Sequence, residues 1–354
     1  MKRILPYLLG LVLFFGIDAA GKTFSFEYQK IVEVPEKPEL IINNSAGDIK
    51  ITGAPVETIT INAIKHVRAA EQDEAEEVAE HIEIKVTQDR GKISIKTNFL
   101  KLKSRSESFW SKLFGSGEDS FGSVDFDITV PQRCKLSVDN SSGTIAISGV
   151  SGDVTATGVS DKMTLQDIYG DLVLNMMTGD VTLTSITGRA DITTGGSNID
   201  FTSITGAVDI HSTSGIKKGL YISGPVTISQ TSGAVDIAYL NGDLQLRSTS
   251  GKVTVGQEEG TISIQTHTGD VEIKTELFSD KDFYVSTTTG SIIFSLPETT
   301  SGKVRIETSS GQIITKLPVS IESVTQNKLT GSFGSGGPQI TLITESGDIT
   351  VTEY

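Results

Sequence analysis

The sequence predicts an all-β chain, specifically a single-stranded parallel β-solenoid (β-helix) with 18-residue coils and a small inserted α+β capping module. Steps of nine residues from Gly143 to Gly269 mark fifteen positions, of which thirteen are glycine. The residues two and four places after each mark are almost always apolar, as at Ile145 and Ile147, with a polar residue usually between them. That alternation is typical of a half-buried strand, and a fixed short period is typical of a solenoid.

The coil is twice the nine-residue step, because the residue two places before each mark alternates in type. One series, which recurs at every second mark, is apolar: Val150, Ile168, Ile186, Ile204, Ile222 and Leu240. The intervening series drifts from Val159 and Met177 to threonines and His267. Stacked coils would repeat about every 4.8 Å, with apolar ladders inside and Asp- and Thr-rich ladders outside. The pattern slips at residues 215–219, where we expect a β-bulge.

Four segments are predicted along the chain. Residues 1–21 are typical of a signal peptide, because two basic residues precede a short apolar run and a small-residue end. Residues 22–53 should form an N-terminal strand and a first coil. Residues 54–133 should form an inserted strand–helix–strand–strand module, with the helix at 69–81, which covers the open end of the solenoid. Residues 134–354 should form the solenoid itself.

A mobile basic-aromatic loop is expected at 101–123, within the inserted module. It holds the only tryptophan, and Phe109, Trp110 and Phe114 lie among basic residues. Exposed aromatic side chains beside lysines suit a partner surface or a membrane interface. Packing against the solenoid flank is the alternative and is favoured over such a contact, since large apolar side chains usually bury. Membrane contact is expected only through residues 108–114 or through an uncleaved signal.

The charge and the single cysteine exclude several classes of function. The formal charge of −14 argues against nucleic acid as a partner, because phosphate binding needs clusters of Lys and Arg. The lone Cys134 cannot form an internal disulfide. Aspartates after the marks, such as Asp153 and Asp270, suit turn chemistry better than calcium binding. We therefore expect no metal and no cofactor.

Several repeat units resemble those of a known bacterial family. They are Asn44-Ser-Ala-Gly-Asp-Ile-Lys-Ile, Asn140-Ser-Ser-Gly-Thr-Ile-Ala-Ile, Ser151-Gly-Asp-Val-Thr-Ala and Thr266-His-Thr-Gly-Asp-Val-Glu-Ile. They are similar to the S-G-D-[VI]-x-[VI] units of the "putative adhesin" β-strand-repeat proteins. The resemblance covers nearly all of the mature chain and implies an exported or membrane-anchored envelope protein. It implies no activity, because the domain of that family has none established.

Three functions follow from these patterns, and the first is favoured. A non-catalytic, exported envelope protein, in the periplasm or at the cell surface, would bind a polysaccharide or a partner protein along its regular faces. A polysaccharide lyase or hydrolase is the second, with Asp200, Asp209 and Asp236 at one strand position and Lys217, Lys218 and Arg247 as possible neighbours. No catalytic motif supports it, and the fold alone does not. The third is a self-assembling structural protein, since the last repeat, 345–354, has no obvious cap. The oligomeric state cannot be predicted.

Overall fold

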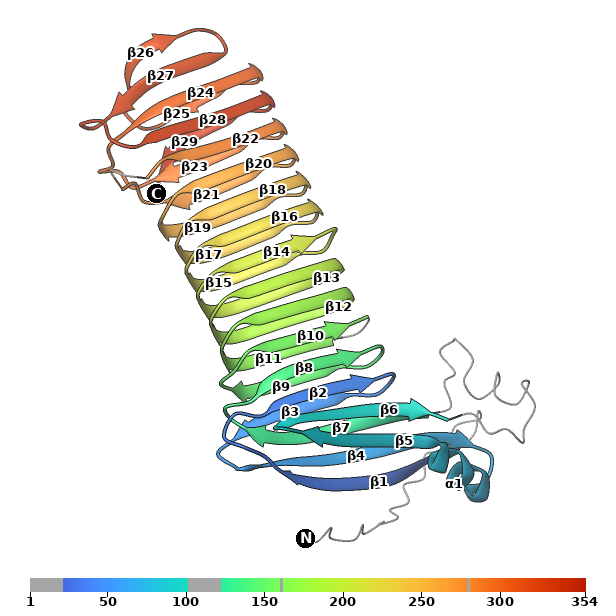
Figure 1. The fold of residues 1–354 in the computed structure, drawn as a ribbon. Helices are drawn as coiled ribbons and strands as arrows, with labels where there is room; N and C mark the ends of the chain where they lie inside the picture. Colours follow the sequence, from blue (N-terminus) through green and yellow to red (C-terminus); the bar gives the residue numbers. More distant parts are fainter. Residues whose placement is uncertain (1–21, 101–121, 160–161, 279–280) are drawn as a thin grey trace. The chain divides into compact units, whose positions relative to one another are not determined.

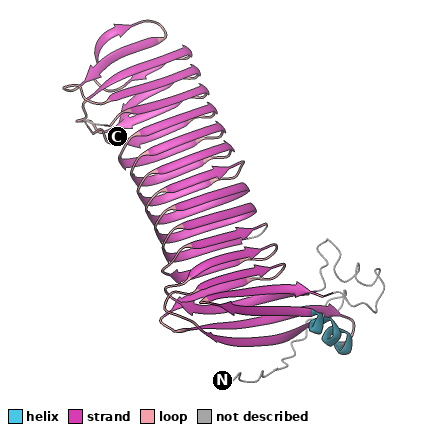
Figure 2. Cartoon of the chain, in the orientation of Figure 1, coloured by secondary structure: helices cyan, strands magenta, loops and turns pink. Residues whose placement is uncertain are grey.

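The computed structural model describes residues 22–100, 122–159, 162–278 and 281–354. It confirms the predicted all-β class, because strands dominate these residues and a single helix occurs among them (Figure 2). The chain divides into two compact units, of which the first ends at Asp171 and the second begins at Leu172.

The first unit contains one helix and eleven strands in its described residues. They are β1 (Lys22–Glu33), β2 (Glu39–Asn44), β3 (Ile49–Ala54), β4 (Thr58–Ala69), α1 (Gln72–His81), β5 (Ile82–Asp89), β6 (Lys92–Phe99), β7 (Gly122–Pro131), β8 (Lys135–Asn140), β9 (Ile145–Val150), β10 (Val154–Gly158) and β11 (Lys162–Tyr169).

The early repeat copy, β2 and β3, lies inside the stack of the first unit (Figure 1). On one side β2 pairs in parallel with β8, and β3 with β9. On the other side β2 pairs with β6, and β3 with β7, both from the predicted module. β4 runs antiparallel between β7 and β1, and α1 packs on β4 through Ala75, Val78 and Ala79. The module therefore extends the stack beyond the first copy.

The second unit is built from strands alone in its described residues. They are β12 (Leu172–Thr187), β13 (Ala190–Thr205), β14 (Val208–Ser212), β15 (Lys217–Ser223), β16 (Val226–Ser232), β17 (Val235–Asn241), β18 (Leu244–Ser250), β19 (Val253–Glu259), β20 (Ile262–Thr268), β21 (Val271–Thr275), β22 (Phe283–Thr289), β23 (Ile292–Leu296), β24 (Gly302–Ser310), β25 (Ile313–Thr315), β26 (Ser320–Val324), β27 (Lys328–Phe333), β28 (Gln339–Ser346) and β29 (Ile349–Glu353).

Parallel pairing at an offset of two nine-residue steps dominates the second unit. Val208 pairs with Val226, Val226 with Leu244, and Leu244 with Ile262. The offset widens at β22, where Ile262 pairs with Phe283. The apolar residues two and four places after the glycine marks are almost fully buried, so that they form the core of the unit.

The two nine-residue halves differ because one of them contains a left-handed residue. Asp167 in the first unit and Ser185, Ser203, Tyr221 and Tyr239 in the second have φ between 54° and 58°, each three places before a mark. That conformation interrupts the strand alternation, so the next residue, such as Ile222, turns into the core. In the other half the alternation continues, and Thr249 and His267 stay exposed.

The β-bulge expected at 215–219 is absent from the register. Ile199 pairs with Lys217 and Phe201 with Gly219 without a break, although the strand itself begins only at Lys217. Gly219 gives room to the Phe201 ring, since a Cβ there would lie 2.7 Å from ring atoms of Phe201. The register shifts fall elsewhere, between Ile237 and Asn241 in the pairing of β17 with β19.

The C-terminal repeat, for which the sequence showed no obvious cap, is not the last layer of the second unit. β28 pairs with β22 on one side and β24 on the other, and β29 lies likewise between β23 and β25 (Figure 1). The β26–β27 hairpin then pairs with β24 through β27. The hairpin therefore covers an edge that the repeat pattern left open.

Candidate functional site

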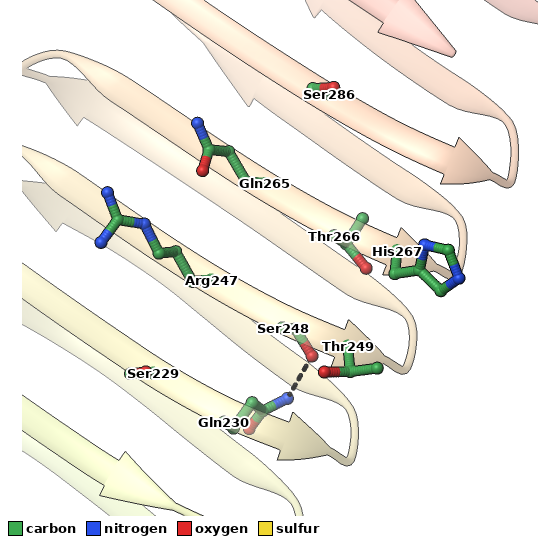
Figure 3. Close-up of a pocket in the computed structure, with 9 residues that line it drawn as sticks. All are labelled: Ser229, Gln230, Arg247, Ser248, Thr249, Gln265, Thr266, His267 and Ser286. Carbon is green, nitrogen blue, oxygen red and sulfur yellow. Dashed lines mark hydrogen bonds between the residues drawn. The ribbon is translucent and has the colours of Figure 1, made fainter. Parts of the chain in front are cut away.

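The residues predicted as a partner contact, Phe109, Trp110 and Phe114, lie outside the described residues, so their role stays a prediction. The described residues contain a different candidate, a polar groove in the second unit. It has a volume of about 510 Å³ and lies across β16, β18, β20 and β22 (Figure 3). We call it the polar groove and define it by its lining: Ser229, Gln230, Arg247, Ser248, Thr249, Gln265, Thr266, His267 and Ser286.

Strand register places the groove residues in columns. Ser229 pairs with Arg247, Arg247 with Gln265, and Gln265 with Ser286, so four polar side chains from successive strands form one outward column. Thr249 and His267 lie two residues further along their strands and face outward as well. Neighbouring strands lie about 4.8 Å apart, so the groove presents polar groups at a regular spacing.

Buried polar side chains between the two outward columns fix the floor of the groove. Gln230 Nε2 donates to the carbonyl oxygen of Gly233 at 2.6 Å and to Ser248 Oγ at 3.3 Å. Ser248 Oγ donates to the carbonyl oxygen of Ser250 at 3.1 Å. Figure 3 draws the Gln230–Ser248 bond as a dashed line between the two strands that carry these residues. These bonds satisfy groups near the turn, so the floor is a structural part of the groove.

The groove is locally cationic in an acidic chain. Its lining has one arginine and one histidine and no carboxylate. Arg133, Arg189 and Arg305 each pair with a carboxylate, whereas Arg247, like Arg68 and Arg90, has no such partner among the described residues. A guanidinium without a protein partner is suited to bind a carboxylate or another anionic group in two-point contact.

The side chains of the groove are suited to bind a sugar polymer. Hydroxyl, amide and guanidinium groups donate and accept hydrogen bonds, as a sugar polymer requires. Glycoside hydrolysis generally uses two carboxyl groups about the scissile bond, and the groove lining supplies none.

A second hollow, of about 590 Å³, lies among turns of the first unit. It is lined by Val34, Pro35, Glu36, Ala54, Pro55, Val56, Glu57, Pro131, Gln132 and Arg133. Here Arg133 Nη1 already lies 2.7 Å from Glu36 Oε1. Because the Arg133 guanidinium is already paired, this hollow is less suited than the polar groove to bind an anionic ligand.

The acidic residues considered for catalysis do not form one cluster. Asp200 and Asp236 flank Lys218 in register, while Asp209 Oδ2 accepts a bond from Arg189 Nη2 at 2.8 Å. Arg247 belongs to the polar groove, on the strand that pairs with β16 and β20. The sequence analysis considered Arg247 as a neighbour of these aspartates, whereas the structure places it among the residues of the polar groove.

Lys217 points into the core of the second unit. It is fully buried, and Nζ donates to Ser212 Oγ and to the carbonyl oxygens of Ser214 and Gly215 at 2.7, 2.8 and 2.9 Å. Burial lowers the pKa of Lys217 to about 8. The ammonium holds together the turn before β15, which explains why the apolar pattern fails at this position.

A polar cluster in the first unit was not foreseen from the sequence. Ser25 Oγ lies 3.2 Å from His66 Nδ1, and His66 Nε2 lies 2.9 Å from Asp125 Oδ2. Asp125 Oδ1 in turn accepts the Asp48 amide at 2.8 Å. None of the three side chains lines either hollow described above. The cluster joins β1, β4 and β7 to the turn of the first repeat copy.

The hydrogen bond to Asp125 raises the pKa of His66 above 6.5, although burial opposes the shift. Burial alone would raise the pKa of Asp125, but hydrogen bonds from His66 and the Asp48 amide lower it below 3.8. Both shifts favour the charged pair.

The aspartates that follow the marks act within the turns. Asp243 Oδ1 accepts the Thr261 amide at 2.8 Å, and Asp270 Oδ1 accepts the Ser291 amide at 2.8 Å. The Thr261 bond lowers the pKa of Asp243. Each carboxylate thus ties one repeat to the next. Within the described ranges, no three His, Cys, Asp or Glu side chains gather as a metal site would require.

No helix in the described part of the chain has the length and apolar character needed to cross a membrane.

Comparison with known proteins identifies a family. The family model described as Toastrack DUF4097 matches residues 66–276 and 226–352. No curated protein matches the chain.

Two solved structures are similar at low identity. A "putative cell adhesion protein" from Clostridium sporogenes ATCC 15579 is 13% identical, with 93% of this chain and 99% of that chain covered and a TM-score of 0.22. A "putative adhesin" from Bacteroides fragilis NCTC 9343 is 12% identical, with 93% and 97% covered and a TM-score of 0.24. At these TM-scores the two structures add nothing to an argument about function.

Proposed function

We propose, from the premise that this chain belongs to the Toastrack DUF4097 family, that it is a non-catalytic binding protein of the cell envelope. Its ligand is a polysaccharide that carries anionic groups, and the polar groove is the contact surface. The unpaired guanidinium of Arg247, within regular columns of polar groups, carries this proposal.

In this proposal the parallel ladders within each unit wind as a β-solenoid of 18-residue coils. The pairing of each residue with its counterpart two nine-residue steps later, from β8 to β10 in the first unit and from β12 to β20 in the second, supports it. Such a coil repeats one side-chain position at the strand spacing, so its flat faces suit a ligand that is itself repetitive.

The proposed place of action is outside the cytoplasm, in the periplasm or at the cell surface. The pattern of residues 1–21 supports export, because a basic start, a short apolar run and a small-residue end are typical of a signal peptide. Envelope polysaccharides are within reach there.

The groove is tested by substitution of Arg247 in the mature chain. Arg247→Ala should weaken retention on an anionic polysaccharide at least about tenfold, because a charged hydrogen bond contributes about 1.5–3 kcal/mol. Arg247→Lys should bind with intermediate affinity, since an ammonium keeps the charge but loses the two-point contact. Affinity electrophoresis in alginate or hyaluronate gels measures both.

Lys303→Ala is the matched control, because it removes one exposed positive charge from β24, outside the groove lining. Equal retention of Arg247→Ala and Lys303→Ala would contradict the groove as the contact surface.

A further inference from the structure

Two tyrosines of the second unit have a backbone conformation that bulky side chains rarely adopt. Tyr221 on β15 and Tyr239 on β17 each have φ of 56°. The equivalent positions one and two repeats earlier hold Ser203 and Ser185, which are small. The left-handed conformation belongs to this corner of the repeat, and a bulky residue is uncommon in it.

Burial does not account for these tyrosines. Their side chains are 56% and 51% exposed, and the two rings stack on each other at 4.8 Å between centroids and 18° between planes. We call this the tyrosine pair. It places a large aromatic surface in solvent at the turn that precedes Gly224 and Gly242, on strands that do not line the polar groove.

The column of the pair continues as a serine on one side and meets a register shift on the other. Before Tyr221 in the column lies Ser203, an exposed serine. On the other side Gln257 pairs with Leu240 and is only 4% exposed, with its Nε2 donating to the carbonyl oxygens of Gly242 and Thr261 at 2.8 and 3.1 Å, and the exposed Glu259 pairs with Asn241. Gln257 points inward because the register shifts between β17 and β19. A flat ligand therefore has access to the faces of the rings.

The surroundings of the pair are polar rather than apolar. Ser223 and Asn241 pair across β15 and β17, and Thr205 pairs with Ser223; all three are exposed. A protein interface generally needs a contiguous apolar core. Two aromatic rings with hydroxyl and amide groups beside them instead match the two sides of a sugar ring, which has an apolar C–H face and a rim of hydroxyls.

We propose that the tyrosine pair is a carbohydrate-binding site that stacks pyranose rings on its outer faces, with hydrogen bonds from Ser223 and Asn241 to sugar hydroxyls. The site goes beyond the proposed function, because its ligand needs no anionic group and it does not depend on the polar groove. Its ligand class is a polysaccharide whose sugars expose an apolar ring face, such as a β-linked glucan or an N-acetylglucosamine polymer.

The test uses variants that separate binding from stability. Tyr221→Asn with Tyr239→Asn removes both rings but places asparagine, which tolerates the left-handed backbone, at each position. We expect affinity for cellohexaose or chitohexaose, measured by calorimetry on the mature chain, to fall at least tenfold, while Tm stays unchanged or rises. Tyr221→Phe with Tyr239→Phe should retain most of the affinity, because the ring does the stacking.

Tyr284→Ala is the matched control, an exposed tyrosine on β22 outside the pair. The proposal is overturned if neither oligosaccharide binds, if the asparagine variant binds as tightly as the wild type, or if its Tm falls, which would assign the rings a structural role. A loss of self-association or of protein capture in that variant, without sugar binding, would likewise overturn it. Arg247→Ala should leave hexasaccharide binding intact, so failure of the groove and failure of the pair are distinguishable.

Discussion

At the scale of single residues, glycine at most of the marks is favoured by backbone conformation, by close stacking, or by both. Gly233 has φ of 119°, and a Cβ there would lie 2.0 Å from the carbonyl oxygen of Gly215, one repeat earlier. Gly256 on β19 has no such constraint, because the nearest atom to its Cβ position would be the Ala238 Cα at 3.7 Å. The nine-residue spacing therefore records a stacking requirement at marks such as Gly233, which an open position such as Gly256 does not share.

Gly233→Ala should lower the stability of the chain, whereas Gly256→Ala should not. The left-handed backbone alone costs about 1–2 kcal/mol for alanine, and the clash with Gly215 adds to this. Gly256→Ala should be neutral or stabilising by up to about 1 kcal/mol. Urea denaturation midpoints of the two variants and the wild type give the comparison. Equal midpoints for both variants would contradict the stacking requirement.

The residue scale also shows what sequence reasoning missed. Ser25, His66 and Asp125 are far apart in the chain and meet only because β1, β4 and β7 pair antiparallel. No spacing in the sequence signals that meeting. The tyrosine pair had a signal, since Tyr221 and Tyr239 lie 18 residues apart at the same place in the repeat, but their left-handed conformation follows from the corner of the repeat and not from the residue type.

At the scale of strands, the period predicted which side chains face inward but not which repeat stacks on which. The inward positions of β12 to β21 are mostly apolar and buried, as the alternation indicated. Every repeat has the same pattern, however, so nothing in it specifies that β28 lies between β22 and β24. The sequence predicted outward ladders of polar residues but not the position of the polar groove. That position depends on which outward side chains lie beside Arg247, and none of those in the groove lining is a carboxylate.

β15 makes the second unit sensitive to pH, because Lys217 is buried there. The pKa of Lys217 falls from 10.5 to about 8 on folding. Between these values the unfolded chain holds the proton and the folded chain has released it, so stability rises with pH through this window. Below pH 8 burial of the charge costs the fold up to about 3 kcal/mol, by the free energy of a pKa shift of this size.

The measurement is the difference in unfolding free energy between the wild type and Lys217→Met at pH 7.5, 9 and 10.5. As the pH rises above 8, the unfolding free energy of the wild type should increase relative to that of Lys217→Met. Lys218→Met, an exposed neighbour on the same strand, should give a constant difference. A constant difference for Lys217→Met as well would contradict the buried-charge account.

At the scale of the whole molecule, each unit has its own way of completing its stack. In the first, the segment between the early copy and the main array supplies β6 and β7 as further layers, with β4 and β1 beyond them. In the second, the β26–β27 hairpin pairs with β24. Free strand edges are prone to pair with other chains, so both arrangements oppose the end-to-end assembly considered from the sequence.

Across the chain, the residues that recur in every repeat serve packing, and the proposed binding residues are ones that do not recur. The glycines, the apolar ladders and the turn aspartates are all explained by contacts within and between repeats. Packing between repeats does not explain the large exposed side chains of Arg247, Tyr221 and Tyr239.

Incubation of the mature chain with a panel of envelope polysaccharides, while retention and product release are both measured, tests the central claim most directly. Binding without turnover predicts that at least one polysaccharide retains the chain and that no new reducing ends or unsaturated products appear over many hours. Release of products would show an enzyme and contradict the account, and so would failure of every polysaccharide to retain the chain.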